Sequence, residues 1–258
     1  MNGYDESSYY SSGSYYNRDY YYYYLLIHYY VMAGSFREKI ADLDGRERGE
    51  LLFFGDSDIA YWEQDPSWEV WNTSSYKAHN IGVGGCTCHN MMKFSQQVME
   101  TFSPPTVVIV CGENDLSFGH TPEQAYDNFK VMIQPFLEES SQVIYIGTKD
   151  EPCNAKMHEL YAAYDKLLLD YASSLAFGTN SMNGTNGLRW TNPTTPPLVF
   201  VDGNQGFDAL GNAGSLYQGD GIHLSPEGYG HWTRWTEAAL GFGDCVHVVS
   251  GECALRMR

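Results

Sequence analysis

The residues that stand out chemically are a serine and, far along the chain, an aspartate and a histidine. Ser57 follows the apolar run Leu51 to Phe54, where a predicted strand gives way to a helix. Asp220 and His223 are three residues apart, just before another predicted helix. At that spacing a carboxylate can hold the Nδ1–H of the imidazole, which leaves Nε2 free to take a proton from a serine hydroxyl. Together these side chains suit nucleophilic chemistry on an acyl group.

Two further blocks offer hydrogen-bond donors. The block Asn80 to Gly85 contains three glycines, which let the main chain approach a ligand and present a backbone amide. In the block Gly112 to Asp115, the side chain of Asn114 can donate two hydrogen bonds. The Ser57 amide, at a helix N-terminus, carries partial positive charge that favours a developing oxyanion. Alone, the Ser57 segment is more typical of a helix cap and Asn114 of a turn, so only the combination of the blocks favours chemistry.

Short apolar runs separated by longer amphipathic stretches predict successive βα units. The runs are rich in β-branched residues and do not alternate, which is typical of parallel strands buried on both faces. They are Leu51 to Phe54, Ala78 to Val83, Thr106 to Cys111, Gln142 to Gly147 and Leu198 to Val201. The helical candidates are Asn90 to Phe102, Glu123 to Glu139, Asn154 to Leu175 and Pro226 to Leu240. We therefore expect a three-layer α/β/α sandwich around a five-stranded parallel sheet, with ligands at the carboxyl ends of its strands.

Taken in order, the four blocks resemble those of the SGNH, or GDSL-like, hydrolase family. The matching residues are Gly55-Asp56-Ser57, Asn80 through Gly85, Gly112-Glu113-Asn114-Asp115 and Asp220-Gly221-Ile222-His223. The resemblance covers roughly residues 50–240. Within the family, the sequence is similar to the compact branch that includes platelet-activating-factor acetylhydrolase-like esterases. It implies the flavodoxin-like SGNH fold. By this resemblance Ser57 is the nucleophile, His223 the general base and acid, and Asp220 its orienting partner, while the oxyanion hole consists of the Ser57 amide, the Gly85 amide and the Asn114 side chain.

The implied activity is serine-dependent hydrolysis of carboxylic esters through an acyl-enzyme on Ser57, without a metal or another cofactor. We expect small-molecule substrates with acetyl or other short acyl groups. A lysophospholipase or thioesterase would use the same triad, and a non-catalytic binding module would keep the same fold, so these alternatives stay open. The sequence contains neither a complete dinucleotide-binding glycine motif nor a Gly-x-Ser-x-Gly elbow.

Asp58 departs from the family pattern, in which an apolar residue usually follows the serine. Because acidic side chains are favoured at helix N-termini, we expect Asp58 to point to solvent; the alternative is an electrostatic effect on His223. Four aromatic residues follow closely and suit either packing of the first helix, which we favour, or a wall for an apolar or sugar group. They are Tyr61, Trp62, Trp68 and Trp71.

The chain has 258 residues with 15 Lys and Arg against 32 Asp and Glu, a net charge of -17. This acidity argues against nucleic-acid and anionic-membrane partners. Of the 21 tyrosines, 12 fall within residues 1–30, so the sequence predicts a disordered, low-complexity tail over residues 1–35. The hydrolase domain is expected over residues 36–245, followed by a C-terminal extension over residues 246–258.

The sequence says little about compartment or oligomeric state. The apolar stretch Leu25 to Ala33 is too short to span a bilayer and makes a poor signal peptide, so localisation stays undetermined. Two glycosylation sequons begin at Asn72 and Asn183. Cys245 and Cys253 are candidates for a disulfide, and the run Cys86-Thr87-Cys88-His89 is more typical of structural cysteines than of a metal site. Two long loops, Phe177 to Pro197 and Asp202 to Ile222, suit either lids or plain insertions.

Overall fold

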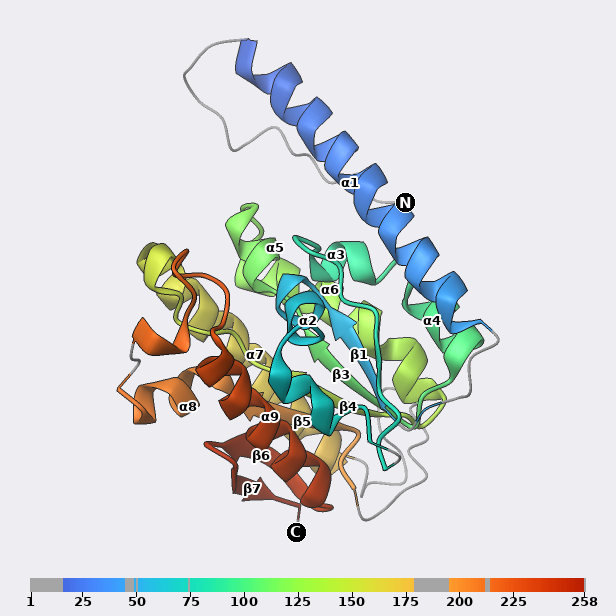
Figure 1. Ribbon diagram of the computed structural model, residues 1–258, viewed down its shortest axis with the longest axis vertical. Coiled ribbons are helices and arrows are strands. Elements are labelled where there is room, and N and C mark those ends of the chain that lie inside the picture. The colour runs from blue at the N-terminus through green and yellow to red at the C-terminus, as the bar shows by residue number, and fades with distance from the viewer. Residues whose placement is uncertain are drawn as a thin grey trace.

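A mostly parallel sheet of seven strands forms the centre of the molecule (Figure 1). The computed structural model describes residues 16–44, 49, 51–73, 75–178, 195–211 and 214–257, with side chains in the first helix from Tyr30 onward. The strand order is β2-β1-β3-β4-β5-β6-β7, and β7 alone runs antiparallel, against β6. The strands are β1 (Leu51–Gly55), β2 (His79–Asn80), β3 (Thr106–Val110), β4 (Gln142–Ile146), β5 (Leu198–Asp202), β6 (Cys245–Val249) and β7 (Glu252–Arg256).

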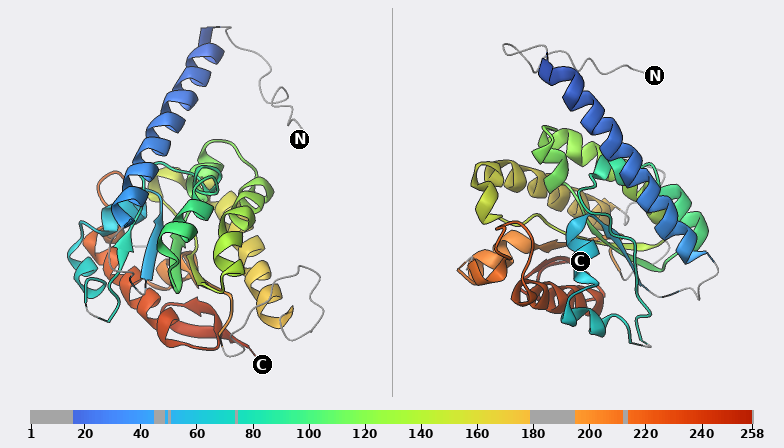
Figure 2. Two further views of the ribbon diagram at one scale, coloured as in Figure 1. Left: turned by 90° about the vertical axis from the view of Figure 1, so that its right-hand side faces the viewer. Right: turned by 45° about the horizontal axis from the view of Figure 1, so that its top comes forward.

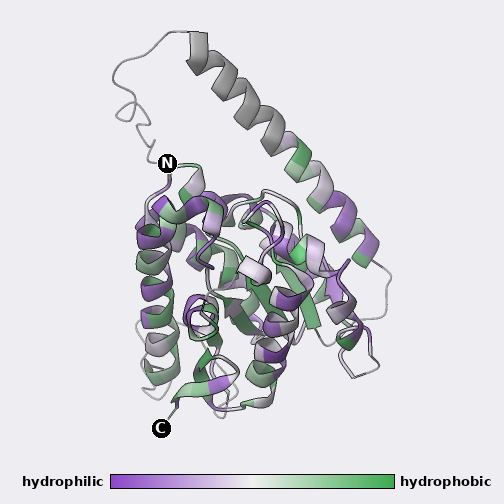
Figure 3. Cartoon of the chain, turned by 60° about the vertical axis from the view of Figure 1, so that its left-hand side comes forward, coloured by the Kyte–Doolittle hydropathy of each residue, from purple (hydrophilic) through white to green (hydrophobic). Residues whose placement is uncertain are grey.

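Both faces of the sheet are covered by helices, which gives the expected three layers. Successive side chains of a strand enter opposite cores: Leu52 and Phe54 enter one apolar cluster, whereas Leu51 and Phe53 enter the other. Figure 3 shows the strands in the hydrophobic colour between these layers. The first face carries α1 (Tyr16–Leu43), α3 (Cys88–Met91), α4 (Ser95–Phe102), α5 (Glu113–Ser117), α6 (Pro122–Glu138) and α7 (His158–Gly178). The second face carries α2 (Ser57–Trp62), η2 (Pro66–Val70), α8 (Gly203–Ala209), η4 (Gly214–Leu216) and α9 (Pro226–Gly241).

The predicted fold class is confirmed, but the predicted number of strands is wrong. All five expected strands are present, and β6 and β7 extend the sheet within the segment that we assigned mainly to a C-terminal extension. In β6 the polar His247 is buried, and its Nε2 has a polar partner in Asp202 Oδ2 at 3.3 Å. In β7 the residues alternate between exposed and half-buried, which lowers its apolar content. Cys245 and Cys253 join the two strands by the expected disulfide.

Side-chain caps begin two of the expected helices. Thr121 caps α6 through a capping box with Gln124, and Ser225 caps α9 by accepting a hydrogen bond from the Gly228 amide. The stretch expected as one helix over residues 90–102 is divided into α3 and α4. The helix expected from Asn154 begins with the 3₁₀ segment η3 (Pro152–Met157) and continues as α7.

The N-terminal region differs from the disordered tail that the sequence predicted. The structure describes residues 16–43 as the helix α1, whose C-terminal part packs against α3 and α4 (Figures 1 and 2). Phe36 is fully buried and stacks on Phe94, with ring centroids 5.1 Å apart. The first 15 residues lie outside the described part.

The two long loops have different outcomes. Residues 179–194 of the first lie outside the described residues, together with the second sequon. The second contains α8 and η4 and leads to Asp220. The sheet order reverses at β1, which has β2 on one side and β3 on the other. Ligands of such folds bind at the carboxyl ends of the strands beside this reversal, where the Ser57 and Asn114 segments lie.

Candidate active site

Ser57 is the first residue of α2 and follows β1 directly. The Asp56 side chain caps this helix by accepting a hydrogen bond from the Asp58 amide at 3.0 Å. The turn requires glycine at position 55, because a Cβ there would lie 2.4 Å from Ile59 Cγ1 and 2.8 Å from the Val110 carbonyl oxygen. This tight passage from strand to helix fixes the place of the serine.

A hydrogen-bonded series brings Ser57, His223 and Asp220 together. The Ser57 hydroxyl lies 3.1 Å from His223 Nε2, and His223 Nδ1 lies 2.6 Å from Asp220 Oδ2. If the carboxylate accepts the Nδ1–H, Nε2 carries a lone pair toward the serine hydroxyl. The imidazole is therefore oriented to take the proton of Ser57.

The turn that holds Asp220 keeps its carboxylate ionised. Partial burial acts to raise the pKa of Asp220, but hydrogen bonds from the His223 side chain and from the Ile222 and His223 amides lower it to about 2. Those amides donate to Asp220 Oδ1 at 2.9 Å and 3.1 Å. A permanent negative charge beside Nδ1 stabilises an imidazolium.

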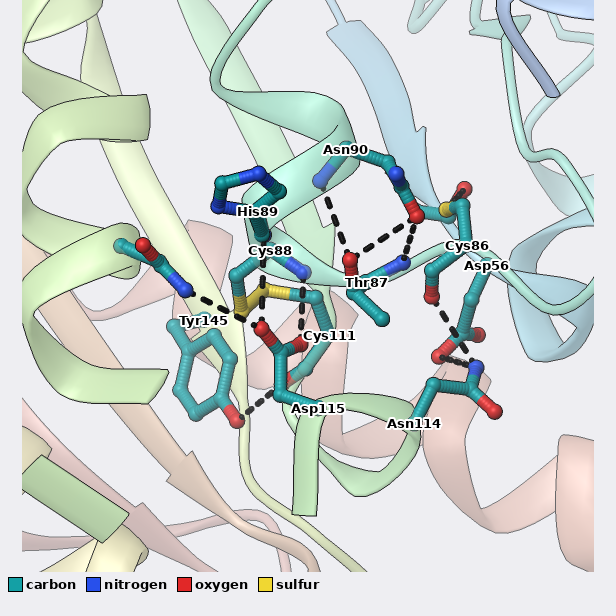
Figure 4. Close-up of a disulfide and its surroundings, with 12 residues drawn as sticks. Asp56, Cys86, Thr87, Cys88, His89, Asn90, Cys111, Asn114, Asp115 and Tyr145 are labelled. Carbon is teal, nitrogen blue, oxygen red and sulfur yellow. Dashed lines mark hydrogen bonds between the residues drawn. A yellow bond between two sulfur atoms is a disulfide. The ribbon is translucent and has the colours of Figure 1, made fainter. Parts of the chain in front are cut away.

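The predicted oxyanion donors lie next to the serine. Gly84 passes so close that a Cβ there would lie 3.9 Å from Ser57 Cβ, and Gly85 has a φ of 73°. Asn114 Nδ2 donates to the Cys86 carbonyl oxygen at 3.0 Å and to Asp56 Oδ2 at 3.3 Å, as Figure 4 shows. All five predicted site residues thus lie on segments that meet at one edge of the sheet.

A disulfide that we did not predict joins the Gly85 and Asn114 segments. Cys88 pairs with Cys111, 23 residues later, and both are buried (Figure 4). On the same two segments, Asp115 Oδ2 accepts a hydrogen bond from the Cys88 amide at 2.7 Å. Cys86 is a buried free thiol whose pKa is well above its ordinary value, chiefly because of burial.

The expectation that Asp58 points to solvent is wrong. Its carboxylate is buried and pairs with the Lys149 ammonium at 2.6 Å. Lys149 was not predictable as a partner from local sequence, because the lysine lies 91 residues away. The available signal was its place three residues after the end of β4, at the same carboxyl edge of the sheet as Ser57.

The aromatic residues after the serine divide between packing and exposure. Trp62, Trp68 and Trp71 are buried in the core, as the packing interpretation predicted. Tyr61 is 41% exposed, and its ring centroid lies 4.8 Å from that of His223 in an edge-to-face arrangement. Tyr61 alone of these four remains open to a ligand.

Within the described ranges, no cluster of three or more His, Cys, Asp or Glu side chains is arranged to hold a metal ion. Over the same part of the chain, no helix has the length and apolar content needed to cross a bilayer.

The family model for GDSL-like lipases and acylhydrolases matches residues 51–236. The chain belongs to this family. It is therefore a hydrolase that acts on ester bonds. The match spans every element that carries the five site residues. A search of curated proteins finds no match.

Solved structures show the same fold at low sequence identity. A Bacteroides fragilis protein named as a candidate acylhydrolase is 21% identical, with a TM-score of 0.57 over 79% of this chain and 93% of its own. A Streptococcus pneumonia protein named as a candidate platelet activating factor is 17% identical, with a TM-score of 0.58 over 84% and 94%. A mutant acetyl-xylooligosaccharide esterase from Geobacillus Stearmophilus is 17% identical, with a TM-score of 0.55 over 77% and 95%.

Proposed function

We propose that this GDSL-like hydrolase cleaves small carboxylic esters with acetyl or other short acyl groups, through an acyl-enzyme on Ser57. The observation that carries the proposal is the unbroken series from the Ser57 hydroxyl through His223 to the ionised Asp220. This arrangement matches the geometric roles of nucleophile, general base and orienting carboxylate.

In the first half-reaction, Ser57 Oγ attacks the acyl carbon and its proton passes to His223 Nε2. Asp220 stabilises the resulting imidazolium. The negative oxygen of the tetrahedral intermediate accepts hydrogen bonds from the Ser57 amide, the Gly85 amide and Asn114 Nδ2. Asn114 would exchange one of its present acceptors for this oxygen.

The intermediate then collapses with cleavage of the bond between the acyl carbon and the alcohol oxygen. His223 Nε2 gives its proton to the departing alcohol, and the acyl group stays on Ser57 as an ester. A water molecule repeats the sequence, with His223 as general base, and releases the carboxylic acid. No cofactor takes part in this scheme.

Charge and exposure favour neutral substrates with a modest alcohol. The chain carries a net charge of -17, and the ionised Asp220 lies at the site, which disfavours anionic esters. The exposed Tyr61 ring lies beside His223, the residue that gives the alcohol its proton in this scheme. An aromatic ring there suits stacking on a sugar, and one structural neighbour is an acetyl-xylooligosaccharide esterase. We therefore favour acetylated carbohydrate.

Initial rates on p-nitrophenyl acetate and p-nitrophenyl octanoate test the reaction and its acyl preference. We expect the acetate to have the higher kcat/KM, and Ser57→Ala to abolish turnover while its circular dichroism matches that of the parent. A panel of acetylated xylooligosaccharide, lysophospholipid and acyl thioester then separates the substrate classes. If lysophospholipid or thioester is turned over faster than the acetylated sugar, that class becomes the substrate in place of the proposed one. A folded parent without any turnover would indicate a binding module.

A further inference from the structure

Lys149 is a buried cation that the proposed mechanism does not use. It follows β4 and has no solvent exposure. Its ammonium lies 2.6 Å from Asp58 Oδ2, 2.7 Å from Glu113 Oε2 and 3.2 Å from Glu151 Oε1. An ammonium group has three N–H bonds, so each can be directed at one of these carboxylates.

Two of these carboxylates adjoin groups of the proposed active site. Asp58 follows Ser57 in the first turn of α2, and Glu113 precedes Asn114 in α5. Glu113 Oε1 also accepts a hydrogen bond from the Lys149 amide at 2.7 Å, so both of its oxygens are held by one residue. Lys149 therefore joins the nucleophile segment to the segment of an oxyanion donor.

The third carboxylate leads to the turn that holds the base. Glu151 is two residues from Cys153, whose amide donates to the Gly221 carbonyl oxygen at 3.1 Å. Gly221 lies between Asp220 and His223 and has a φ of 66°. Glu151 itself is fixed by the Tyr161 hydroxyl, which donates to Oε2 at 3.1 Å.

The cluster formed by Lys149, Asp58, Glu113 and Glu151 depends on the positive charge of the lysine. One ammonium faces three buried carboxylates, and burial raises the pKa of Glu113 well above its ordinary value despite the opposing effect of Lys149. The charge of the lysine is retained, because the three carboxylates outweigh the effect of burial and raise the pKa of Lys149. Without the ammonium, the three acidic side chains would lose the donor that they share, and their segments would no longer be held together at this point.

We infer that Lys149 is a positioning residue. Through Asp58, Glu113 and Glu151, it holds the segments of Ser57, Asn114 and Asp220–His223 in place relative to one another. The inference rests on the proposed function. It differs from a role in stability alone, because a displacement of about 1 Å at reacting groups can lower turnover roughly 10²-fold in a protein that is still folded.

Lys149→Met tests the inference with a side chain of similar length and no charge. We expect kcat for p-nitrophenyl acetate, per active site titrated with fluorophosphonate, to fall roughly 10–10²-fold while KM stays within about threefold. The matched control is Lys156→Met, which removes an exposed lysine from the neighbouring η3 and leaves both constants unchanged. The melting temperature of each variant is measured, and all assays are run below the unfolding transition.

Asp58→Asn is the second variant, for the case in which Lys149→Met does not fold. Asparagine keeps the size of the side chain and one acceptor for Lys149, and it removes one of the excess negative charges. We expect a folded protein with kcat lowered several-fold and KM retained. Folded Lys149→Met or Asp58→Asn with the kcat of the parent would overturn the inference, whereas an inactive parent would instead remove the proposed function.

Discussion

Asn114 is the donor whose role can be tested by a single residue change. Its side-chain amide is held between Cys86 and Asp56, as in Figure 4, and Asp56 directly precedes Ser57. If it stabilises the oxyanion, Asn114→Ala should lower kcat roughly 10²–10³-fold with little change in KM. Steady-state kinetics on p-nitrophenyl acetate measure this effect. An unchanged kcat would exclude Asn114 from the oxyanion hole.

Asp165 makes stability depend on pH. Burial raises its pKa to about 8, against the opposing hydrogen bonds from Thr148. Between its ordinary value near 4 and about 8, the folded protein binds more protons than the unfolded chain, so stability falls as pH rises through this window. Asp165→Asn keeps an acceptor for the Thr148 amide and removes the charge.

We expect Asp165→Asn to raise the melting temperature at pH 8 by roughly 2–4 °C for each kcal/mol gained. The gain should vanish near pH 4, where the parent carboxyl is also neutral. Scanning calorimetry at both pH values checks this expectation. Equal gains at pH 4 and pH 8 would show that the change acts through packing and not through charge.

At the residue scale, the sequence predicted which polar side chains lie close together but not how every group is held. Ser57, Asn114 and His223 were predictable because parallel strands deliver their carboxyl ends to one edge of the sheet. The partners of Asp58 were not, because its pairing with Lys149 depends on contacts between segments 91 residues apart. A buried carboxylate and a solvated one have the same local sequence.

At the scale of elements, the disulfide Cys88–Cys111 joins the two segments that carry the predicted oxyanion donors. Replacing both cysteines by alanine should lower the free energy of unfolding by about 3 kcal/mol, as loop entropy predicts for this separation. We also expect a lower kcat, because the segments that carry Gly85 and Asn114 lose the disulfide that joins them. Chemical denaturation and kinetics on the same preparations measure both effects.

The second disulfide provides the matched control. Cys245 lies at the amino end of β6, the end opposite to the site, and its partner Cys253 is in β7. Replacing this pair by alanine should lower stability without changing kcat. If both double variants lowered kcat equally, the Cys88–Cys111 link would have no particular bearing on the site.

The elements themselves were largely predictable. Buried parallel strands are continuous apolar runs, so β1, β3, β4 and β5 were evident from composition. β6 was not, because His247 interrupts its apolar run; the buried imidazole contacts Asp202 on the neighbouring strand β5. The break between α3 and α4 was not predictable either. The segment Met92 to Phe94 that joins the two helices contains no glycine or proline, the residues that usually mark a helix end.

At the scale of the whole molecule, the boundary of the folding unit needs a test. We propose that it includes the part of α1 from Met32 onward, because Phe36 and Ile40 are buried against the body. A chain beginning at residue 45 should be less stable than one beginning at residue 30 by at least about 3 kcal/mol, the cost of removing one buried phenylalanine. Thermal unfolding compares the two, and equal stability would place the boundary after α1.

The central claim is that Ser57 carries the acyl group, and covalent labelling tests it most directly. Parent and Ser57→Ala proteins are treated with a fluorophosphonate, and the adduct is located by intact mass and peptide mapping. We predict one adduct on the parent, on the peptide that contains Ser57, and none on the variant. An adduct of equal yield on folded Ser57→Ala, or a parent adduct on another residue, would contradict the account.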